Sequence, residues 1–384
     1  MDNDAINHPF RRRKETPITR GRPYLYVDSS LAPRSRNGEA SYRLFRMPGL
    51  PPNHELFARA ALPAYGHHPD APLRLLSLSE NATYLVGDTD PMVLRVHRPG
   101  YHSLDAIRSE LSWMAALRTE TDVVTPHLIT ARDGSDVVAA SVGDVTLHVD
   151  AVTFVPGCTA EDAPAAVGFD QLGRLTAVMH DHVRGWQAPE FFTRFRWDLE
   201  TMLSPAARWG DWRGAPNLDD DGAALIAQAA DRIQARLTEF GTGPDRFGLV
   251  HADLRLANLM VNPEDPGGPI TVIDFDDSGW SWYLTDVGAM VSFIEDTPEA
   301  EQMIADWLTG YRSARDLPGD HLELIPTFVM LRRIMLSAWI GTHADAHGAI
   351  PLAPTFASGT AALADRYLND PSWLAEAMWG SPLR

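Results

Sequence analysis

Lysine is almost absent from this sequence of 384 residues, since Lys14 is its single lysine. Any phosphate contact in the folded body that needs a cationic side chain must therefore come from arginine. Cysteine is equally scarce, because Cys158 stands alone. A lone cysteine excludes an internal disulfide and a cysteine-based zinc site, and it favours a reducing compartment, so we expect a cytoplasmic protein.

Signals for membranes, export and P-loops are also missing. The sequence has no recognisable apolar run of membrane length, and residues 1–50 are broken by Arg, Asp, Asn and Pro, which argues against an export leader. The G-x-x-x-x-G-K-[ST] loop of P-loop nucleotide-binding proteins is absent as well. We therefore expect neither a membrane partner nor a P-loop enzyme.

Basic charge does not balance acidic charge in the second part of the chain. Residues 1–157 carry 18 acidic and 17 basic side chains, whereas residues 158–384 carry 33 and 16. An acidic surface serves solubility, repels nucleic acid, and attracts cations such as Mg²⁺ or an amine-bearing substrate. The sequence thus predicts no nucleic-acid partner and leaves the oligomeric state open.

The first part of the chain shows no regular periodicity. Residues 1–55 combine the basic run Arg11–Lys14 with seven prolines and have no sustained period of 2 or 3.6. We interpret this segment as an N-terminal extension that is partly disordered.

The next hundred residues are rich in short apolar runs typical of strands. One helix is predicted between them, over Leu104–Leu117, where apolar residues recur at helical spacing. Strands in close succession favour an antiparallel sheet. The predicted strands are Leu73–Leu78, Thr83–Val86, Met92–Val96 and Thr146–Val155.

After Pro156 and Gly157 the pattern becomes mainly helical. A short β-rich segment, Gly248–Phe275, interrupts the helices. We therefore expect an α+β protein with a small antiparallel-sheet N-lobe at 56–155 and a larger, mainly helical C-lobe at 156–384. The predicted helices are Leu172–Met179, Ala223–Leu237, Met303–Tyr311, Leu322–Ile340 and Phe356–Leu368.

The strongest chemical signal lies in the β-rich segment. It reads Gly248-Leu-Val-His-Ala-Asp253-Leu-Arg-Leu-Ala-Asn258-Leu-Met-Val261 and continues with Thr271-Val-Ile-Asp274-Phe-Asp-Asp277. Phosphoryl transfer to an alcohol needs a carboxylate near the incoming hydroxyl, which suits Asp253. Carboxylate and amide oxygens are ligands that Mg²⁺ accepts, which suits Asn258 and Asp274. Two apolar β-segments can deliver all three side chains to one cleft.

These motifs resemble the aminoglycoside phosphotransferase and choline kinase-like family, which has a two-lobe protein kinase-like fold. Val93-Leu-Arg-Val-His-Arg-Pro-Gly100 and Asp274-Phe-Asp-Asp277 are most similar to the branch of stress-response kinase A and the homoserine kinase-type proteins. The resemblance implies that ATP and Mg²⁺ are used, with Asp253 as catalytic base and Asn258 and Asp274 as metal ligands. Asp276 is a candidate for a second metal contact or for orienting the loop.

Arginines are the candidates for phosphate contacts in this resemblance. Arg255, two residues after the base, lies where many kinases carry a basic residue that faces the transferred phosphate. Arg95 lies where kinase-like folds carry a strand lysine, and Glu110 lies on the helix that supplies its glutamate partner. An ordinary strand arginine remains the alternative for Arg95.

Two further segments are implied to contact the nucleotide. The turn between the first two strands has no glycine, so we expect Ser79 and Thr83 to offer hydroxyls to the phosphates, with a plain hairpin as the alternative. The segment Thr153, Phe154 and Val155 resembles the hinge whose backbone pairs with adenine, and an interdomain joint would need the same residues.

Several tempting residues have plainer interpretations. For His251, shaping the loop is favoured over proton transfer. Asp286 is implied to brace that loop. His343 and His347 have metal-ligand spacing, but a further ligand is not evident, so a solvated helix end is favoured. Aromatic residues in the C-lobe, among them Trp280 and Trp307, fit either an acceptor pocket or the core.

The predicted function is transfer of the γ-phosphate of ATP to a hydroxyl of a small, amine-bearing acceptor of aminoglycoside, amino sugar or amino alcohol type. The alternatives are a Ser/Thr protein kinase of the stress-response type and a non-catalytic nucleotide-binding regulatory module. The missing strand lysine and the glycine-free turn favour the module, whereas the joint presence of Asp253, Asn258 and Asp274 favours catalysis.

Overall fold

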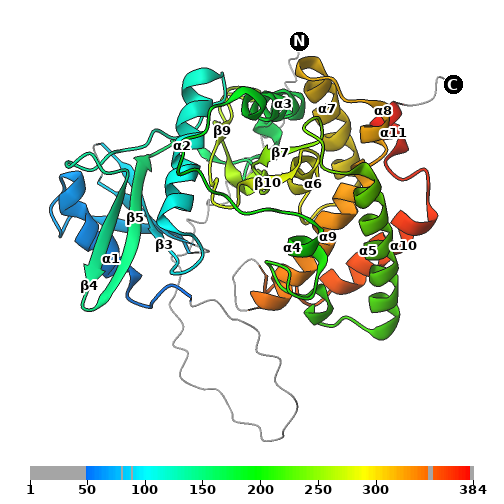
Figure 1. The fold of residues 1–384 in the computed structure, drawn as a ribbon, viewed down its shortest axis with the longest axis horizontal. Coiled ribbons are helices and arrows are strands. Elements are labelled where there is room, and N and C mark those ends of the chain that lie inside the picture. Colours follow the sequence, from blue (N-terminus) through cyan, green and yellow to red (C-terminus); the bar gives the residue numbers. More distant parts are fainter. Residues whose placement is uncertain (1–48, 79–80, 88–89, 345–348, 381–384) are drawn as a thin grey trace, which may run out of the picture. The chain divides into compact units, whose positions relative to one another are not determined.

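The computed structural model describes residues 49–78, 81–87, 90–344 and 349–380, and Met47–Arg384 forms one compact unit. Most of the predicted extension 1–55, together with Ser79 and His347, lies outside the described residues. Helix α1, His54–Ala61, begins just before the predicted end of that extension. Within the described part, the chain builds a sheet lobe first and a helical lobe second (Figure 1).

The N-lobe sheet has five strands in the order β1-β2-β3-β5-β4, and all neighbours are antiparallel. The predicted antiparallel sheet is therefore confirmed. Strand β4 was not predicted, because its sequence VVAASV alternates too weakly to distinguish a strand from a loop. The strands are β1 Leu73–Leu78, β2 Asn81–Val86, β3 Met92–His97, β4 Val137–Val142 and β5 Val145–Thr153.

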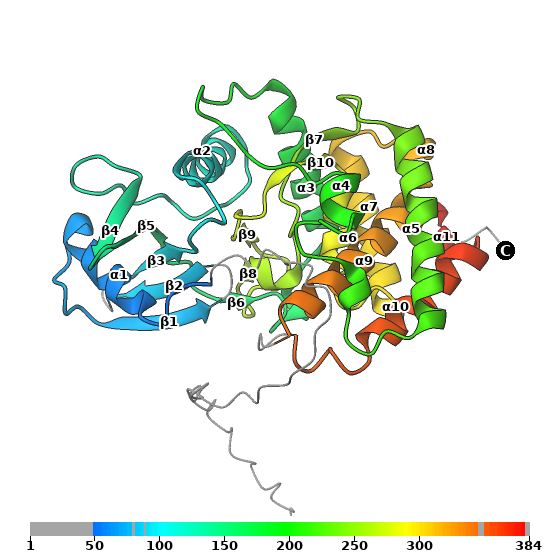
Figure 2. The same cartoon turned by 60° about the horizontal axis from the view of Figure 1, so that its bottom comes forward.

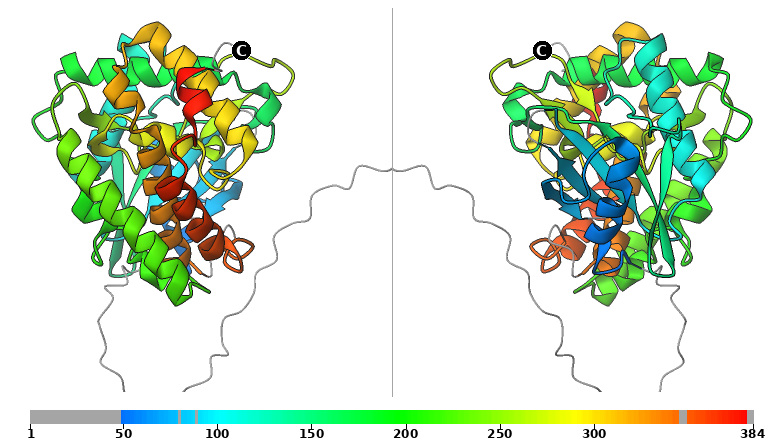
Figure 3. Two further views of the ribbon diagram at one scale, coloured as in Figure 1. Left: turned by 90° about the vertical axis from the view of Figure 1, so that its right-hand side faces the viewer. Right: turned by 90° about the vertical axis from the view of Figure 1, so that its left-hand side faces the viewer.

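The period of two along β3 sends its side chains to two different environments. Leu94 and Val96 join the apolar core under α1, together with Phe57 and Leu62. Helix α1 covers this face in the right-hand view of Figure 3. Arg95 lies between those residues in sequence and so points to the opposite face. Helix α2, Leu104–Glu120, begins at the N-cap Ser103 and supplies Glu110 to that second face.

The C-lobe is built from helices that pack around one apolar core. Helices α5, α9 and α10 pack side by side, and α3 packs against α7 (Figure 1). All five helices predicted for this lobe are present. Helices α3, α5 and α7 extend beyond both predicted limits, α10 begins where predicted, and α9 begins at Ile325 rather than Leu322. The helices are α3 Phe169–Gly185, α4 Leu199–Leu203, α5 Asp220–Phe240, α6 Thr285–Met290, α7 Pro298–Ala314, α8 Gly319–Leu322, α9 Ile325–Thr342, α10 Phe356–Asn369 and α11 Ala375–Trp379.

The stretch Gly319–Thr342 is long and apolar enough to cross a membrane by length and composition alone. The expectation that the sequence contains no such run was therefore wrong. However, 89% of its most apolar window is buried inside the protein, so α9 is the central helix of the C-lobe core. Two of its buried residues, Arg332 and Arg333, are charged.

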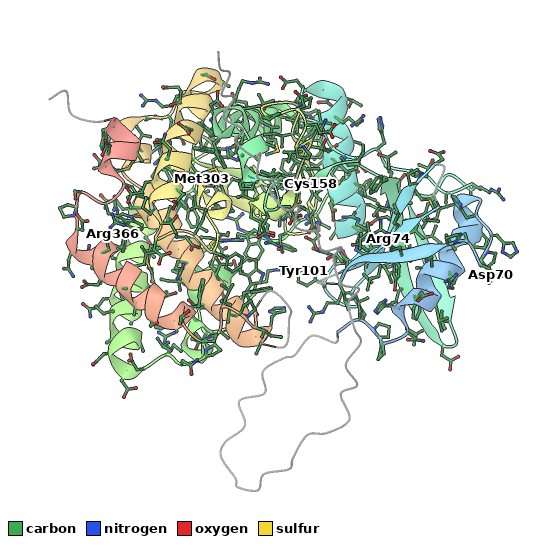
Figure 4. The ribbon with its side chains drawn as sticks, turned by 180° about the vertical axis from the view of Figure 1, so that it is seen from behind. Asp70, Arg74, Tyr101, Cys158, Met303 and Arg366 are labelled. Atoms are coloured by element: carbon green, nitrogen blue, oxygen red, sulfur yellow. The ribbon has the colours of Figure 1, made fainter. Side chains whose placement is uncertain are left out.

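A tight joint connects the two lobes. Gly157 has φ +123°, and a Cβ atom at this position would lie 2.3 Å from the carbonyl oxygen of Val261, so only glycine fits. The chain then forms β6, Cys158–Thr159, which pairs with β8, Leu259–Val261. Figure 4 labels Cys158 in this region. The joint thus leads directly into the small sheets that carry the chemical motif.

Two small antiparallel sheets flank that motif (Figure 2). Strand β8 also pairs with β9, Thr271–Val272, as predicted for the two apolar segments. Strand β7, Phe247–Val250, pairs with β10, Gly279–Trp282. The loop from β7 to β8 and the loop from β9 to β10 therefore both connect one of these small sheets to the other.

Candidate active site

Asp253 lies in the loop between β7 and β8, and the backbone of the preceding residue, Ala252, is strained. Ala252 has φ +65°, a conformation that non-glycine residues rarely adopt. Asp286 on α6 holds this turn, because its Oδ1 accepts the N–H of Ala252 at 2.7 Å and its Oδ2 accepts that of His251 at 3.3 Å. His180 on α3 also contacts Asp286 Oδ2, at 2.9 Å. These contacts agree with the predicted bracing role of Asp286.

His251 fits the loop-shaping interpretation. Its Nε2 lies 3.1 Å from the carbonyl oxygen of Ile273 and must donate there, and its Nδ1 lies 3.3 Å from the backbone N–H of Asp253 and accepts from it. Both ring nitrogens are thus used within the protein. The histidine joins the Asp253 loop to the end of the Ile273 segment.

Asn258 and Asp253 contact each other directly. Asn258 Nδ2 donates to the Asp253 carboxylate Oδ2 at 2.7 Å and to its main-chain oxygen at 2.9 Å. With both amide hydrogens used in this way, the side-chain oxygen is the atom that remains for a cation.

Asp274 follows β9 and has φ +64°, a second strained position in the site. The backbone N–H of Ile273 donates to the carbonyl of Asn258 at 3.0 Å, so the two motif segments lie side by side. Burial raises the pKa of the Asp274 carboxyl and the nearby carboxylates of Asp253 and Glu110 raise it further, whereas the positive charge of Arg95 lowers it in part. Carboxylates that repel each other in a buried site suit a divalent cation, and Mg²⁺ ligand chemistry fits these residues.

The Asp253 carboxylate is flanked by two arginines. Burial alone would raise its pKa, but the positive charges of Arg332 and Arg255 hold the pKa below its usual value. Arg255 is about one-third exposed, and its Nε lies 3.4 Å from Asp253 Oδ2. Arg332 is buried, and its Nη2 lies 2.5 Å from Asp253 Oδ1.

Arg332 was not predicted as a site residue. It lies on α9, 79 positions after Asp253. Arginine is almost never fully buried without a partner. The two adjacent arginines inside the apolar run Leu322–Ile340 were therefore the available signal that a buried acidic partner existed. Its neighbour Arg333 pairs with Glu295 instead, at 2.7 Å.

Arg95 pairs with two carboxylates on the inner face of the sheet. Its Nη1 lies 2.5 Å from Glu110 Oε1, and its Nε and Nη2 each donate to Asp150 at 2.9 Å. Asp150, on β5, was not predicted. Burial would raise its pKa, but Arg95 and His97 lower it to about 2. Arg95 and Glu110 are thus brought together, within a buried network that an ordinary surface arginine does not form.

The loop between β9 and β10 is tied to the N-lobe. Asn81 on β2 donates to Asp276 at 3.2 Å, and Tyr101 donates to Asp277 at 2.7 Å. Figure 4 labels Tyr101, which precedes α2. Arg194 is buried and donates to the carbonyl oxygens of Phe275, Asp276 and Ser278, and also to that of Ala106 on α2. Arg194 therefore links α2 to the segment that carries Asp274.

The hinge candidates lie at the end of β5. The N–H of Thr153 donates to His127 and that of Phe154 to Pro91, whereas that of Val155 has no protein acceptor among the described residues. Thr83 lies on β2, opposite Arg95 on β3. The structure thus brings Thr83 near the Arg95 network.

Other predicted candidates lie elsewhere. Trp307, like Trp282 and Tyr311, is buried in the C-lobe core, whereas Trp280 is exposed. His343 stacks on Trp339 at the end of α9. Across the described ranges, no group of three or more His, Cys, Asp or Glu side chains has the geometry of a metal cluster.

Comparison with known families decides to which family this chain belongs. The model of the phosphotransferase enzyme family matches residues 73–317, a range that includes both motif segments. This chain belongs to the phosphotransferase enzyme family. The resemblance inferred from the sequence and the kinase-like α+β fold are thereby confirmed, and the protein is an ATP-dependent phosphotransferase.

Known members of the family show how widely the similarity extends. The solved structure of a microcompartment-associated aminopropanol kinase is 45% identical, covers 82% of this chain and 97% of its own, and has a TM-score of 0.76. The amicoumacin kinase of Bacillus subtilis (strain 168) is 25% identical over 296 residues, which are 73% of this chain and 83% of that protein. An amicoumacin kinase in complex with AMP-PNP and Ca²⁺ is 22% identical, covers 81% of this chain and 93% of its own, and shares the fold with a TM-score of 0.66.

Proposed function

We propose that this phosphotransferase moves the γ-phosphoryl group of Mg-ATP to the hydroxyl of a small amino alcohol in the cytoplasm. The observation that carries the proposal is the direct contact of Asp253 with Asn258, next to the strained Asp274 segment. A base and two oxygen ligands in one place are the parts that phosphoryl transfer to an alcohol requires.

Each residue has a defined part in this proposal. Asp253 accepts the hydroxyl proton as the acceptor oxygen bonds to the γ-phosphorus and the bond to the β-phosphate oxygen breaks, releasing ADP. Asn258 and Asp274 hold Mg²⁺, which when bound neutralises charge on the phosphate oxygens. Arg255 is half-buried beside Asp253 and faces the transferred group. Asp276 is retained as a candidate second metal contact.

The N-lobe supplies the nucleotide contacts. The Arg95 guanidinium, fixed by Glu110 and Asp150, donates its remaining hydrogens to the phosphates. The Val155 N–H, which lacks a protein acceptor in the described structure, donates to the adenine edge. Ser79 and Thr83 contribute hydroxyls to the phosphates, as the sequence predicted.

An amino alcohol is the favoured acceptor for two independent reasons. The solved structure with 45% identity is of an aminopropanol kinase. In addition, residues 158–384 hold 33 acidic and 16 basic side chains, and such a lobe attracts a cationic acceptor.

A panel of acceptors tests this function. The purified protein is incubated with Mg-ATP and, in turn, with aminopropanol, ethanolamine, an aminoglycoside and a protein mixture, and phosphorylated products are identified directly. We expect phosphorylation of an amino alcohol, which Asp274→Asn abolishes. Preferential phosphorylation of the aminoglycoside or of proteins would overturn the proposed acceptor class.

A further inference from the structure

Arg332 is held in a fixed position by three different partners. Its Nη2 lies 2.5 Å from Asp253 Oδ1, its Nη1 donates to the Ala252 carbonyl at 3.2 Å, and its Nε donates to Ser292 Oγ at 2.8 Å. The guanidinium carbon also lies 4.9 Å from the ring centre of Trp209. Only 3% of this residue is exposed. A planar guanidinium with all three nitrogens engaged can hardly rotate.

Two donors thus hold the two oxygens of the Asp253 carboxylate. Arg332 contacts Oδ1, and Asn258 Nδ2 donates to Oδ2 at 2.7 Å. These contacts fix rotation of the carboxylate about its last side-chain bond. Each carboxylate oxygen can accept two hydrogen bonds, so a position remains for an acceptor hydroxyl.

The adjacent arginine on the same helix makes the choice of partner informative. Arg333 is buried as well, but it pairs with Glu295 at 2.7 Å and donates to Thr360 at 3.0 Å, and neither residue belongs to the Asp253 loop. Stabilisation of the core is thus enough to explain the contacts of Arg333. Arg332 instead connects the central helix to the proposed base and to the strained Ala252 backbone.

We propose that Arg332 is a positioning residue that sets the orientation of the Asp253 carboxylate toward the acceptor hydroxyl. This inference rests on the proposed role of Asp253. Arg332 does not contact the reacting atoms, and it acts through the base. Phosphoryl transfer depends steeply on such placement, since an error of about 1 Å can cost about a hundredfold in rate.

The test compares Arg332→Met and Arg332→Lys with Arg333→Met, which removes a buried ion pair of the same kind on the same helix. For each variant, kcat and the KM values for ATP and for the amino alcohol that the wild-type protein phosphorylates are measured, together with thermal stability. We expect Arg332→Met to lower kcat about a hundredfold and to change both KM values less than about twofold. Arg332→Lys should recover part of kcat, and Arg333→Met should keep it.

A double variant separates positioning from general loss of structure. Because Arg332 acts through Asp253, adding Arg332→Met to Asp253→Asn should lower kcat no further. If Arg332→Met does not fold, Arg332→Lys replaces it, both as the single variant and in the double variant with Asp253→Asn. Equal losses of kcat in Arg332→Met and Arg333→Met, or an unchanged kcat in Arg332→Lys with normal stability, would overturn the inference. A wild-type protein that phosphorylates no amino alcohol would instead refute only the proposed acceptor. The Arg332 variants would then be compared with whichever acceptor is active.

Discussion

The guanidinium of Arg95 on β3 lies 2.5 Å from the carboxylate of Glu110 on α2. The same guanidinium donates twice to Asp150 on β5, so it joins two strands and a helix. Within the described residues, Glu110 Oε2 has no hydrogen-bond partner, although Arg194 Nη1 lies 4.0 Å from it. The position of α2 is therefore coupled through arginines to both the sheet and the Asp274 segment.

Replacing Arg95 with methionine should weaken both nucleotide binding and the fold. Removal of Arg95 takes the ion-pair partner from the buried Glu110 and leaves Asp150 paired with His97 alone, and loss of one partner of a buried ion pair costs about 3–5 kcal/mol in unfolding free energy. We expect KM for ATP to rise at least about tenfold, because the cationic phosphate contact is lost. Denaturant unfolding and ATP titration check the two effects, and an unchanged KM in folded protein would remove Arg95 from the nucleotide site.

The Asp286→Asn variant should lower kcat more than it lowers stability. The amide can still accept one N–H from Ala252 or His251, but its own NH₂ group then faces a second donor. We expect a kcat decrease of about tenfold to a hundredfold, since the Asp253 loop loses its anchor. Steady-state kinetics with a melting curve measure this, and wild-type kcat would show that the loop keeps its shape without Asp286.

Protonation of His180 in the unfolded chain should make the folded protein less stable in mild acid. Burial lowers its pKa, although Asp286 and Asp181 raise it and Arg315 lowers it further. The unfolded chain therefore binds a proton below about pH 6.5 that the folded chain excludes, and stability falls as pH decreases through that value.

The slope of unfolding free energy against pH measures this effect. It should reach at most about 1.4 kcal/mol per pH unit for this one group. The variant His180→Gln, compared with wild type between pH 5 and 7, should have a shallower slope. Parallel curves for the two proteins would show that His180 takes up its proton in the folded state.

Gly157→Ala should destabilise the joint between the lobes. The new Cβ would lie 2.3 Å from the Val261 carbonyl oxygen, and φ is +123°. We expect a loss of more than about 1 kcal/mol in unfolding free energy. Gly185→Ala is the matched control, because nothing lies within 4 Å of its Cβ position and its φ is ordinary. Similar melting temperatures for the two variants would contradict this explanation.

Local patterns allowed much of the fold to be predicted from the sequence. Strand β1 and the start of α2 match their predicted limits, because alternation and a serine N-cap are encoded within a few residues. Asp253, Asn258 and Asp274 were recognisable for the same reason, since they stand in two short motifs.

The remaining site residues depend on contacts that local patterns do not encode. Arg332 meets Asp253 across 79 positions, and Arg194 meets Phe275 across 81. Asp150 lies 55 positions from Arg95, in a strand that otherwise reads as ordinary. Each of these charged residues is buried, so its partner is known only once the tertiary structure has brought the segments together.

The central claim is that Asp253 is the base of an ATP-dependent phosphotransferase. Single-turnover transfer from Mg-ATP to the amino alcohol that the wild-type protein accepts tests it most directly, with Asp253→Asn beside wild type and nucleotide binding measured in parallel. The account predicts that the variant binds ATP within about twofold of wild type and transfers phosphate at least about a hundredfold more slowly. Transfer at the wild-type rate by the variant would contradict it.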